Sequence, residues 1–214
     1  MNDKIVVIGA SGFGRETLDV LSALTPGSPA VEVSGVLDDN PSAENLSRLE
    51  ARNAQYLGDI DGYLSGPVPD SHFVVGIGNP RTRSAIHSRF LKAGMSPYSA
   101  VHRTVVMGEQ ATIRPGAVVC AGALISTNVH LGAAVHVNPG ATVGHDSILE
   151  DFVSINPGAI ISGEVSIGAA SLIGAGAIVL QGLRVGEDSV VGAGSVVTKD
   201  VPSGVVVKGV PARW

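Results

Sequence analysis

A histidine followed directly by an aspartate, His145-Asp146, is the pair in this 214-residue chain best suited to acid–base chemistry. An imidazole, with an ordinary pKa near ~6.5, can accept a proton at neutral pH. A carboxylate held beside it fixes the tautomer and stabilises the imidazolium that forms. The sequence therefore offers a general base at this point, and a solvated surface histidine is the alternative.

The pair lies inside a run of six-residue repeats that extends from residue 101 to residue 202. A period of six fits neither an α-helix nor a plain strand. It predicts a solenoid whose coils have three flat sides, with one aliphatic residue per repeat pointing inward and stacking on its equivalent eighteen residues away. The aliphatic positions are Val101, Met107, Ile113, Val119, Ile125, Leu131, Val137, Val143, Leu149, Ile155, Ile161, Ile167, Ile173, Val179, Val185, Val191 and Val197. His145 comes two residues after inward-pointing Val143, so we expect its side chain to face outward.

The first hundred residues have the pattern of an α/β nucleotide-binding unit. Residues 4–8 (KIVVI) form a continuous apolar run, which is typical of a strand buried on both faces. The glycine-rich stretch 9–14 (GASGFG) follows, and residues 15–24 have near-helical spacing of apolar residues. Glycines let the backbone approach a phosphate, and a helix N-terminus offers free N–H groups. A tight turn without any ligand fits this motif equally well.

Two further predicted strands end in residues that could contact the same ligand. The strand 31–37 runs into Asp38-Asp39, and the strand 73–77 runs into Gly78, where Asn79 and Pro80 begin a helix that continues to residue 92. In open parallel sheets, ligands bind at the carboxyl ends of the strands, and an acidic residue there commonly holds a ribose hydroxyl. A solvated strand end is the alternative for the two aspartates.

Composition narrows the class of protein. The net charge is −5 with no basic stripe, which argues against nucleic-acid binding. No apolar run reaches the length of a membrane span, so we expect a cytoplasmic protein without membrane insertion. The single cysteine, Cys120, cannot form an internal disulfide, and with no adjacent base it is interpreted as a small residue that fills space in the packing or at the surface. Most glycines lie after residue 100, which indicates two domains, 1–100 and 101–214.

Four segments together resemble a known family: GASGFGRE (9–16), the Asp38-Asp39 strand end, GIGNPRTR (76–83) and VGHDSILEDFVSINPGA (143–159). The chain resembles, over nearly its whole length, the sugar acetyltransferases that include the bacillosamine-type UDP-4-amino-sugar N-acetyltransferases and the sialic acid O-acetyltransferases. The resemblance implies a Rossmann-like nucleotide-sugar-binding domain followed by a left-handed parallel β-helix of hexapeptide repeats that binds acetyl-CoA. It also implies a homotrimer whose active sites are built from two chains.

The resemblance assigns roles to individual residues. His145 would be the general base, and Asp146 would take the place of an acid that is often Glu in the family. The residues implied for acetyl-CoA are Ser154, Gly163, Ala175, Ala193 and Lys208. The residues implied for the acceptor nucleotide are Ser11, Gly12, Phe13, Asp38, Asp39 and Gly78. The family often has a histidine at the position of Ser154, and whether His136, eighteen residues earlier, compensates is left open.

The resemblance implies acetyl transfer to the amine of a nucleotide-linked 4-amino-4,6-dideoxy sugar, with UDP as the expected nucleotide. O-acetylation of sialic acid or another sugar hydroxyl is one alternative, and a non-catalytic nucleotide-sugar-binding scaffold is another. A zinc enzyme like the hexapeptide carbonic anhydrases is the lesser alternative, because His130, His136 and His145 do not have the spacing of that site. No metal is therefore expected.

Overall fold

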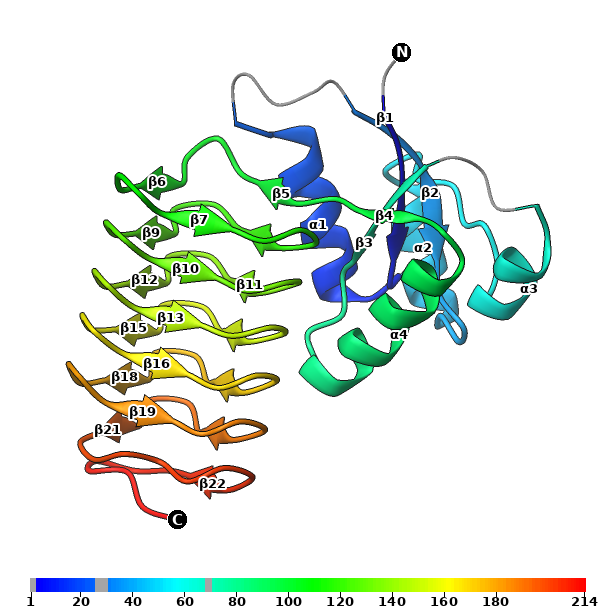
Figure 1. The fold of residues 1–214 in the computed structure, drawn as a ribbon. Helices are drawn as coiled ribbons and strands as arrows, with labels where there is room; N and C mark the ends of the chain where they lie inside the picture. Colours follow the sequence, from blue (N-terminus) through cyan, green and yellow to red (C-terminus); the bar gives the residue numbers. More distant parts are fainter. Residues whose placement is uncertain (1–2, 26–30, 68–70) are drawn as a thin grey trace.

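A computed structural model of the chain describes residues 3–25, 31–67 and 71–214, and it forms an α/β domain beside a β-helix (Figure 1). The α/β domain is a parallel sheet with strand order β2-β1-β3-β4. Its elements are β1 (Asp3–Ile8), α1 (Gly12–Ser22), β2 (Val31–Leu37), α2 (Ala43–Glu50), α3 (Ile60–Ser65), β3 (His72–Val75), α4 (Pro80–Lys92) and β4 (Ser96–Pro97). Of the helices in the described residues, none is long and apolar enough to cross a bilayer.

Strand β1 lies at the centre of this sheet because its residues are apolar on both faces. Ile5 and Val7 pack with Leu18 and Leu21 of α1 on one side. Residues Val6 and Ile8 pack on the other side, in a second cluster to which α4 contributes Ile86 and Phe90. Helices therefore cover both faces of the sheet, as the continuous apolar run predicted.

Two elements, α1 and β3, have boundaries that differ from the sequence prediction by two or more residues. Helix α1 begins at Gly12 rather than at residue 15, so the second half of the glycine-rich stretch is its first turn. Strand β3 ends at Val75, two residues earlier than expected. The start of α4 agrees with the prediction: Pro80 is in its first turn, and the Asn79 side chain accepts a hydrogen bond from the Thr82 N–H at 3.0 Å.

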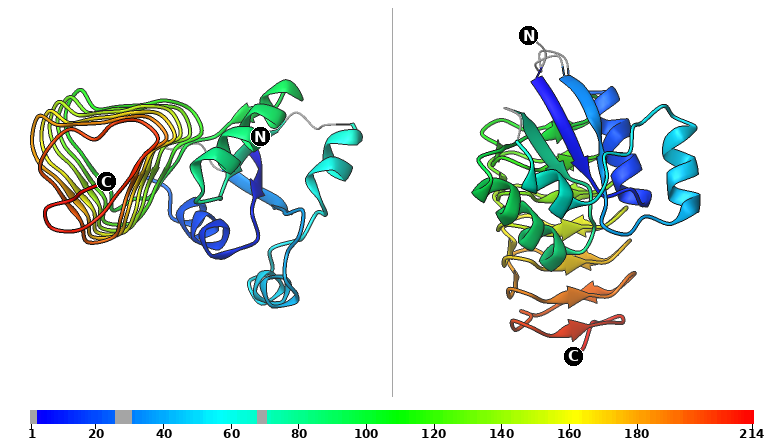
Figure 2. Two further views of the ribbon diagram at one scale, coloured as in Figure 1. Left: turned by 90° about the horizontal axis from the view of Figure 1, so that it is seen from below. Right: turned by 90° about the vertical axis from the view of Figure 1, so that its right-hand side faces the viewer.

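The β-helix has a triangular cross-section, seen along its axis in Figure 2. The docked face, against which the α/β domain packs, holds β5 (Ala100–Val101), β8 (Val118–Val119), β11 (His136–Val137), β14 (Ser154–Ile155), β17 (Leu172–Ile173), β20 (Val190–Val191) and β22 (Val206–Val207). The apolar face holds β6 (Val106–Met107), β9 (Leu124–Ile125), β12 (Thr142–Val143), β15 (Ile160–Ile161), β18 (Ile178–Val179) and β21 (Val196–Val197). The pocket face holds β7 (Thr112–Ile113), β10 (His130–Leu131), β13 (Ile148–Leu149), β16 (Ser166–Ile167) and β19 (Arg184–Val185).

The predicted inward stacking is confirmed. Strands on each face pair in parallel at a spacing of eighteen residues, as in Val137 with Ile155, and the aliphatic positions from Val119 to Val197 are at most 2% exposed. The three positions of the first coil are less buried: Val101 and Ile113 are partly exposed and Met107 is 41% exposed, because their strands lie at the edges of the three faces. The final coil is shorter: Val190 pairs with Val206, sixteen residues on.

Candidate functional site

His145 and Asp146 form the turn between β12 and β13, at the corner between the apolar face and the pocket face. Asp146 has a left-handed backbone (φ 59°), and its N–H donates to the Thr127 carbonyl one coil away at 3.1 Å. This turn brings Asp146 Oδ2 to 2.7 Å from His145 Nδ1, with both side chains about half exposed. With the Nδ1 proton facing the carboxylate, Nε2 is the ring nitrogen left to act on a substrate.

The other carboxylate oxygen of Asp146 is held by Asn128, whose Nδ2 donates to Oδ1 at 2.8 Å. Hydrogen bonds from Asn128 and then from His145 lower the pKa of Asp146. The carboxylate is therefore ionised and fixed in place at neutral pH. Sequence reasoning missed Asn128, although its position, eighteen residues before Asp146, was a usable signal.

Gly163 lies one coil beyond His145, in the same corner, and the imidazole ring covers it. A Cβ built on Gly163 would be 2.5 Å from both Cε1 and Nε2 of His145. The next residue, Glu164, donates its N–H to the His145 carbonyl at 2.7 Å. Glycine at position 163 therefore leaves the room that the ring occupies, and the structure brings this predicted residue together with the His–Asp pair.

The other residues expected to bind acetyl-CoA lie elsewhere on the chain. Ala175 and Ala193 are exposed at the corner between the docked face and the apolar face, and Lys208 is exposed in the last coil. Ser154 is buried on the docked face, where its hydroxyl accepts from Arg83 Nη2 at 2.8 Å and donates to the Gly78 carbonyl at 3.2 Å. Within one chain, the structure brings only Gly163 next to His145.

The six residues expected to bind the acceptor lie together where β1, β2 and β3 end. Asp38 accepts from the Ala10 N–H at 2.8 Å, and Asp39 accepts from the Ile60 N–H at 2.8 Å, so both carboxylates also hold local backbone. Helix α1 starts beside them, and its N-cap residue, Ser11, makes no side-chain capping bond. The loops after β1 and β3 are neighbours here, and this is the position where such sheets bind ligands.

The glycines at this edge have two different uses. A Cβ on Gly14 would lie 1.7 Å from the Gly9 carbonyl oxygen, and one on Gly76 would lie 2.7 Å from the Gly14 Cα, so these glycines allow α1 to pack against the strands. By contrast, a Cβ built on Gly12 or Gly78 would have no heavy atom of the described residues within 4 Å, apart from atoms of the adjoining residues and, for Gly12, of its own helix backbone. These two glycines border open space.

His136 is fully buried under the glycine-rich loop, with its ring centroid 4.6 Å from that of Phe13. Burial is the main cause that lowers the pKa of His136 well below the ordinary value, and the charge of Arg83 lowers it further. The backbone of Val75 has the opposite, smaller effect on this pKa. The ring is therefore neutral and shielded from solvent.

Cys120 is buried as well. Its burial, and to a smaller extent the negative charge of Glu16, raises the pKa of its thiol to about 12. A thiol in this environment is a poor nucleophile.

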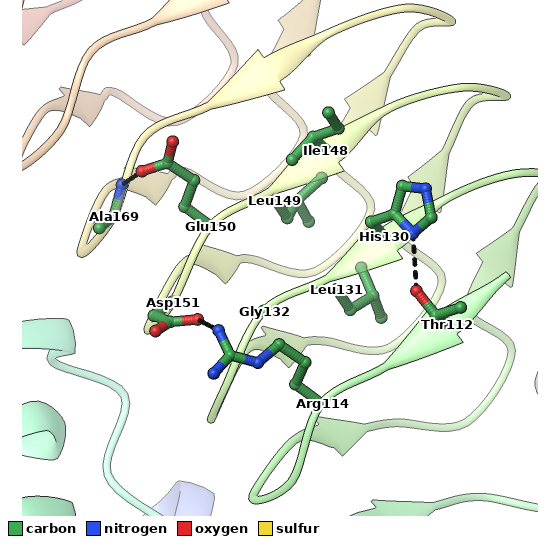
Figure 3. A pocket seen from close by; sticks show the side chains of 10 residues that line it. All are labelled: Thr112, Arg114, His130, Leu131, Gly132, Ile148, Leu149, Glu150, Asp151 and Ala169. Atoms are coloured by element: carbon green, nitrogen blue, oxygen red, sulfur yellow. Dashed lines mark hydrogen bonds and ion pairs between the residues drawn. The ribbon is translucent and has the colours of Figure 1, made fainter.

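A cavity of about 450 Å³ is hollowed into the pocket face (Figure 3). Its polar side chains are already paired: His130 with Thr112 at 2.7 Å, and Arg114 with Asp151 at 2.9 Å. None of the predicted site residues lines it. In the part of the chain that the structure describes, no three His, Cys, Asp or Glu side chains are grouped so that they could hold a metal ion.

Comparisons with known proteins agree with both halves of this architecture. Residues 4–90 match the model of the PglD N-terminal domain, and residues 164–199 match the hexapeptide repeat of succinyl-transferase. GDP-perosamine N-acetyltransferase from Escherichia coli O157:H7 is 32% identical over 148 residues, which is 69% of this chain and 64% of that protein. The chain therefore spans somewhat less than two thirds of the length of this relative.

Two solved structures cover the chain almost completely. The acetyltransferase domain of PglB from Neisseria gonorrhoeae FA1090, in complex with acetyl coenzyme A, has a TM-score of 0.85 and 31% identity over 100% of this chain and 99% of that one. PerB from Caulobacter crescentus, in complex with CoA and GDP-perosamine, has a TM-score of 0.85 and 28% identity over 98% of this chain and 96% of that one. The chain belongs to the family of hexapeptide-repeat sugar N-acetyltransferases that carry a PglD-type N-terminal domain.

Proposed function

We propose that this protein transfers the acetyl group of acetyl-CoA to the amine of a nucleotide-linked 4-amino-4,6-dideoxy sugar. The observation that carries the proposal is the His145–Asp146 pair at 2.7 Å, with its exposed ring lying over Gly163. The solved relatives bound to acetyl coenzyme A, or to CoA with GDP-perosamine, support both substrate classes.

The chemistry is direct transfer. The sugar amine attacks the thioester carbonyl carbon while His145 Nε2 takes the proton that the nitrogen loses, and Asp146 stabilises the resulting imidazolium. A backbone N–H at this corner would stabilise the tetrahedral oxyanion. Collapse of that intermediate breaks the C–S bond, and the proton held by His145 passes to the departing CoA sulfur. No metal is needed for this sequence of steps.

The geometry of one chain supports an active site shared between two. The acceptor-binding edge belongs to the domain that packs on the docked face, whereas His145 is at the corner between the other two faces. In a triangular prism, that corner is the only one that does not border the docked face (Figure 2). The base of one chain would therefore act on an acceptor held by a neighbouring chain.

The apolar face offers a surface for this neighbour. Its outward side chains include Val106, Leu124 and Ile160, which are 60%, 46% and 43% exposed. An exposed apolar patch of this kind marks an interaction site, and threefold association of identical prisms would close it. We infer a homotrimer, and a monomeric mass by light scattering would overturn the shared-site arrangement.

Thiol release from acetyl-CoA against a panel of acceptors tests the reaction. The panel holds UDP-, GDP- and dTDP-linked 4-amino-4,6-dideoxy sugars together with free and CMP-linked sialic acid. UDP is the nucleotide expected from the sequence, and GDP is favoured by the two GDP-perosamine relatives. Release that depends on one amino sugar identifies the substrate, and release with hydroxyl acceptors alone would reassign the protein to O-acetylation. Nucleotide-sugar binding without turnover would favour the scaffold alternative.

His145→Ala tests the base. Loss of a general base costs on the order of 10²- to 10⁴-fold in rate, so kcat should fall by that factor while circular dichroism and particle mass stay unchanged. A variant that kept a near-native kcat would disprove the assignment.

A further inference from the structure

Arg83 is a charged side chain that the proposed reaction does not use, yet it is completely buried between the two domains. Burial lowers its pKa to about 9, so the guanidinium still carries its charge at neutral pH. Six oxygens accept its N–H groups: those of Ala134, Ile77, Gly78, Phe152, Val153 and the Ser154 hydroxyl. A buried charge is tolerated only where such partners are supplied, so this position is built for an arginine.

The acceptor oxygens belong to two groups. Nη1 donates to the carbonyls of Ile77 (2.8 Å) and Gly78 (3.2 Å), in the loop that follows β3. Nε donates to the Ala134 carbonyl (2.9 Å), and Nη2 donates to the Phe152 carbonyl (2.6 Å) in the next coil of the β-helix. One planar side chain therefore joins the acceptor-binding edge to two consecutive coils.

The β-helix also contacts that edge directly. The Ser154 hydroxyl donates to the Gly78 carbonyl, which thus receives hydrogen bonds from both Arg83 and Ser154. His136, which pairs with Ser154 in register, packs against Phe13 in the first turn of α1. The Gly78 loop and the first turn of α1, which flank the acceptor position, are therefore supported from beneath by adjacent coils.

The geometry points to Arg83 as a positioning residue that fixes the Gly78 loop on the β-helix and so sets the affinity for the acceptor nucleotide sugar. This inference rests on the proposed function, because it assumes that the acceptor binds at the Gly78 edge. Arg83 itself would not touch the substrate, since it is buried behind the loop that does. It acts through the two carbonyls whose positions it holds.

The test is a comparison of Arg83→Lys with Arg89→Met, a control on the same helix. Arg89 forms an exposed ion pair with Asp61, and both residues belong to the α/β domain. A lysine retains the charge but cannot present five donors in a plane, so the loop should shift. We expect the acceptor KM to rise about tenfold or more in Arg83→Lys, with the KM for acetyl-CoA within about twofold of wild type. Arg89→Met should leave both constants unchanged.

Ser154→Ala is the milder second variant, in case Arg83→Lys fails to fold. It removes one donor to Gly78, and we expect a smaller rise in acceptor KM without a change in the KM for acetyl-CoA. A rise in the acetyl-CoA KM instead would mean that Ser154 serves the donor, and the positioning role would fail. So would a fall in kcat with both KM values unchanged, because that is the result of a merely smaller folded fraction.

Calorimetry with UDP and GDP separates this inference from the proposed reaction. If wild-type protein does not transfer acetyl groups but binds a nucleoside diphosphate, the reaction fails, and weaker binding by Arg83→Lys would still support the positioning role. If wild type turns over and Arg83→Lys keeps its acceptor KM and nucleotide affinity, the positioning role is wrong while the reaction stands. Wild-type protein that neither turns over nor binds a nucleotide would overturn both.

Discussion

Replacing Gly163 by alanine would displace the proposed base without changing its chemistry. A Cβ at this position would lie 2.5 Å from His145 Nε2, whereas ordinary contacts begin at 3.4 Å, so the ring must move by about 0.9 Å. A misplacement of ~1 Å in a catalytic group can cost about 10²-fold in rate. We therefore expect kcat to fall about 10²-fold in Gly163→Ala.

The backbone should accept this substitution. Alanine already occupies the same place in other repeats, at Ala169 and Ala175, and Gly163 does not have a left-handed backbone. Thiol release with saturating acceptor measures kcat, and Ala169→Ser is the control, because it adds one atom at the matching place in the next repeat. A Gly163→Ala enzyme with kcat within threefold of wild type and an unchanged Tm would refute the placement of the reacting atoms beside Nε2.

Two further predictions concern the carboxylate and the thiol. Asp146→Asn should lower kcat by about 10- to 100-fold, less than for a buried triad because the pair is half exposed. Because the folded pKa of Asp146 is lowered, its contribution to stability is present above the ordinary carboxyl pKa and is lost as the pH falls through the folded value. The Tm difference between wild type and Asp146→Asn should therefore narrow towards pH 3, and a difference that widens there would contradict the pKa direction. With a pKa of about 12, Cys120 is a thiolate in only about 10⁻⁴ of molecules at pH 8, so native protein should resist iodoacetamide for hours and Cys120→Ala should keep its kcat. Rapid native labelling, read by mass spectrometry, would count against this burial.

The solenoid could be predicted from the sequence because its signal is redundant. Every coil repeats the same inward position, so a deviation such as exposed Met107 does not obscure the period. The His–Asp pair could be predicted as well, because the turn places neighbouring residues side by side. The outward orientation of the His145 side chain could be predicted because His145 comes two residues after inward-pointing Val143 in the sequence.

The contacts between the domains could not be predicted. The sequence analysis gave Arg83 no role of its own and assigned Ser154 to acetyl-CoA, whereas the structure joins the two in a buried network. The start of α1 was also missed, because Gly12 and Gly14 have low helix propensity, and the tight packing against Gly9 that accounts for Gly14 is a tertiary contact. These features depend on tertiary contacts between distant segments, which a single sequence does not encode as a local pattern.

Arg83 fastens the α/β domain to the same part of the β-helix that carries His145. Ala134 and Phe152, whose carbonyls hold Arg83, stand at corresponding corners one coil apart, and residue 145 lies between them along the chain. In the proposed trimer, rotation about an axis parallel to the β-helix preserves height, so a neighbour's His145 would stand level with this chain's Gly78 loop. Height on this scaffold changes in steps of about 4.8 Å, the spacing of adjacent strands. The β-helix thus sets the height of the acceptor relative to the base. If the residues that bind Arg83 lay one coil further along, the acceptor would be displaced from the base by one strand spacing along the axis.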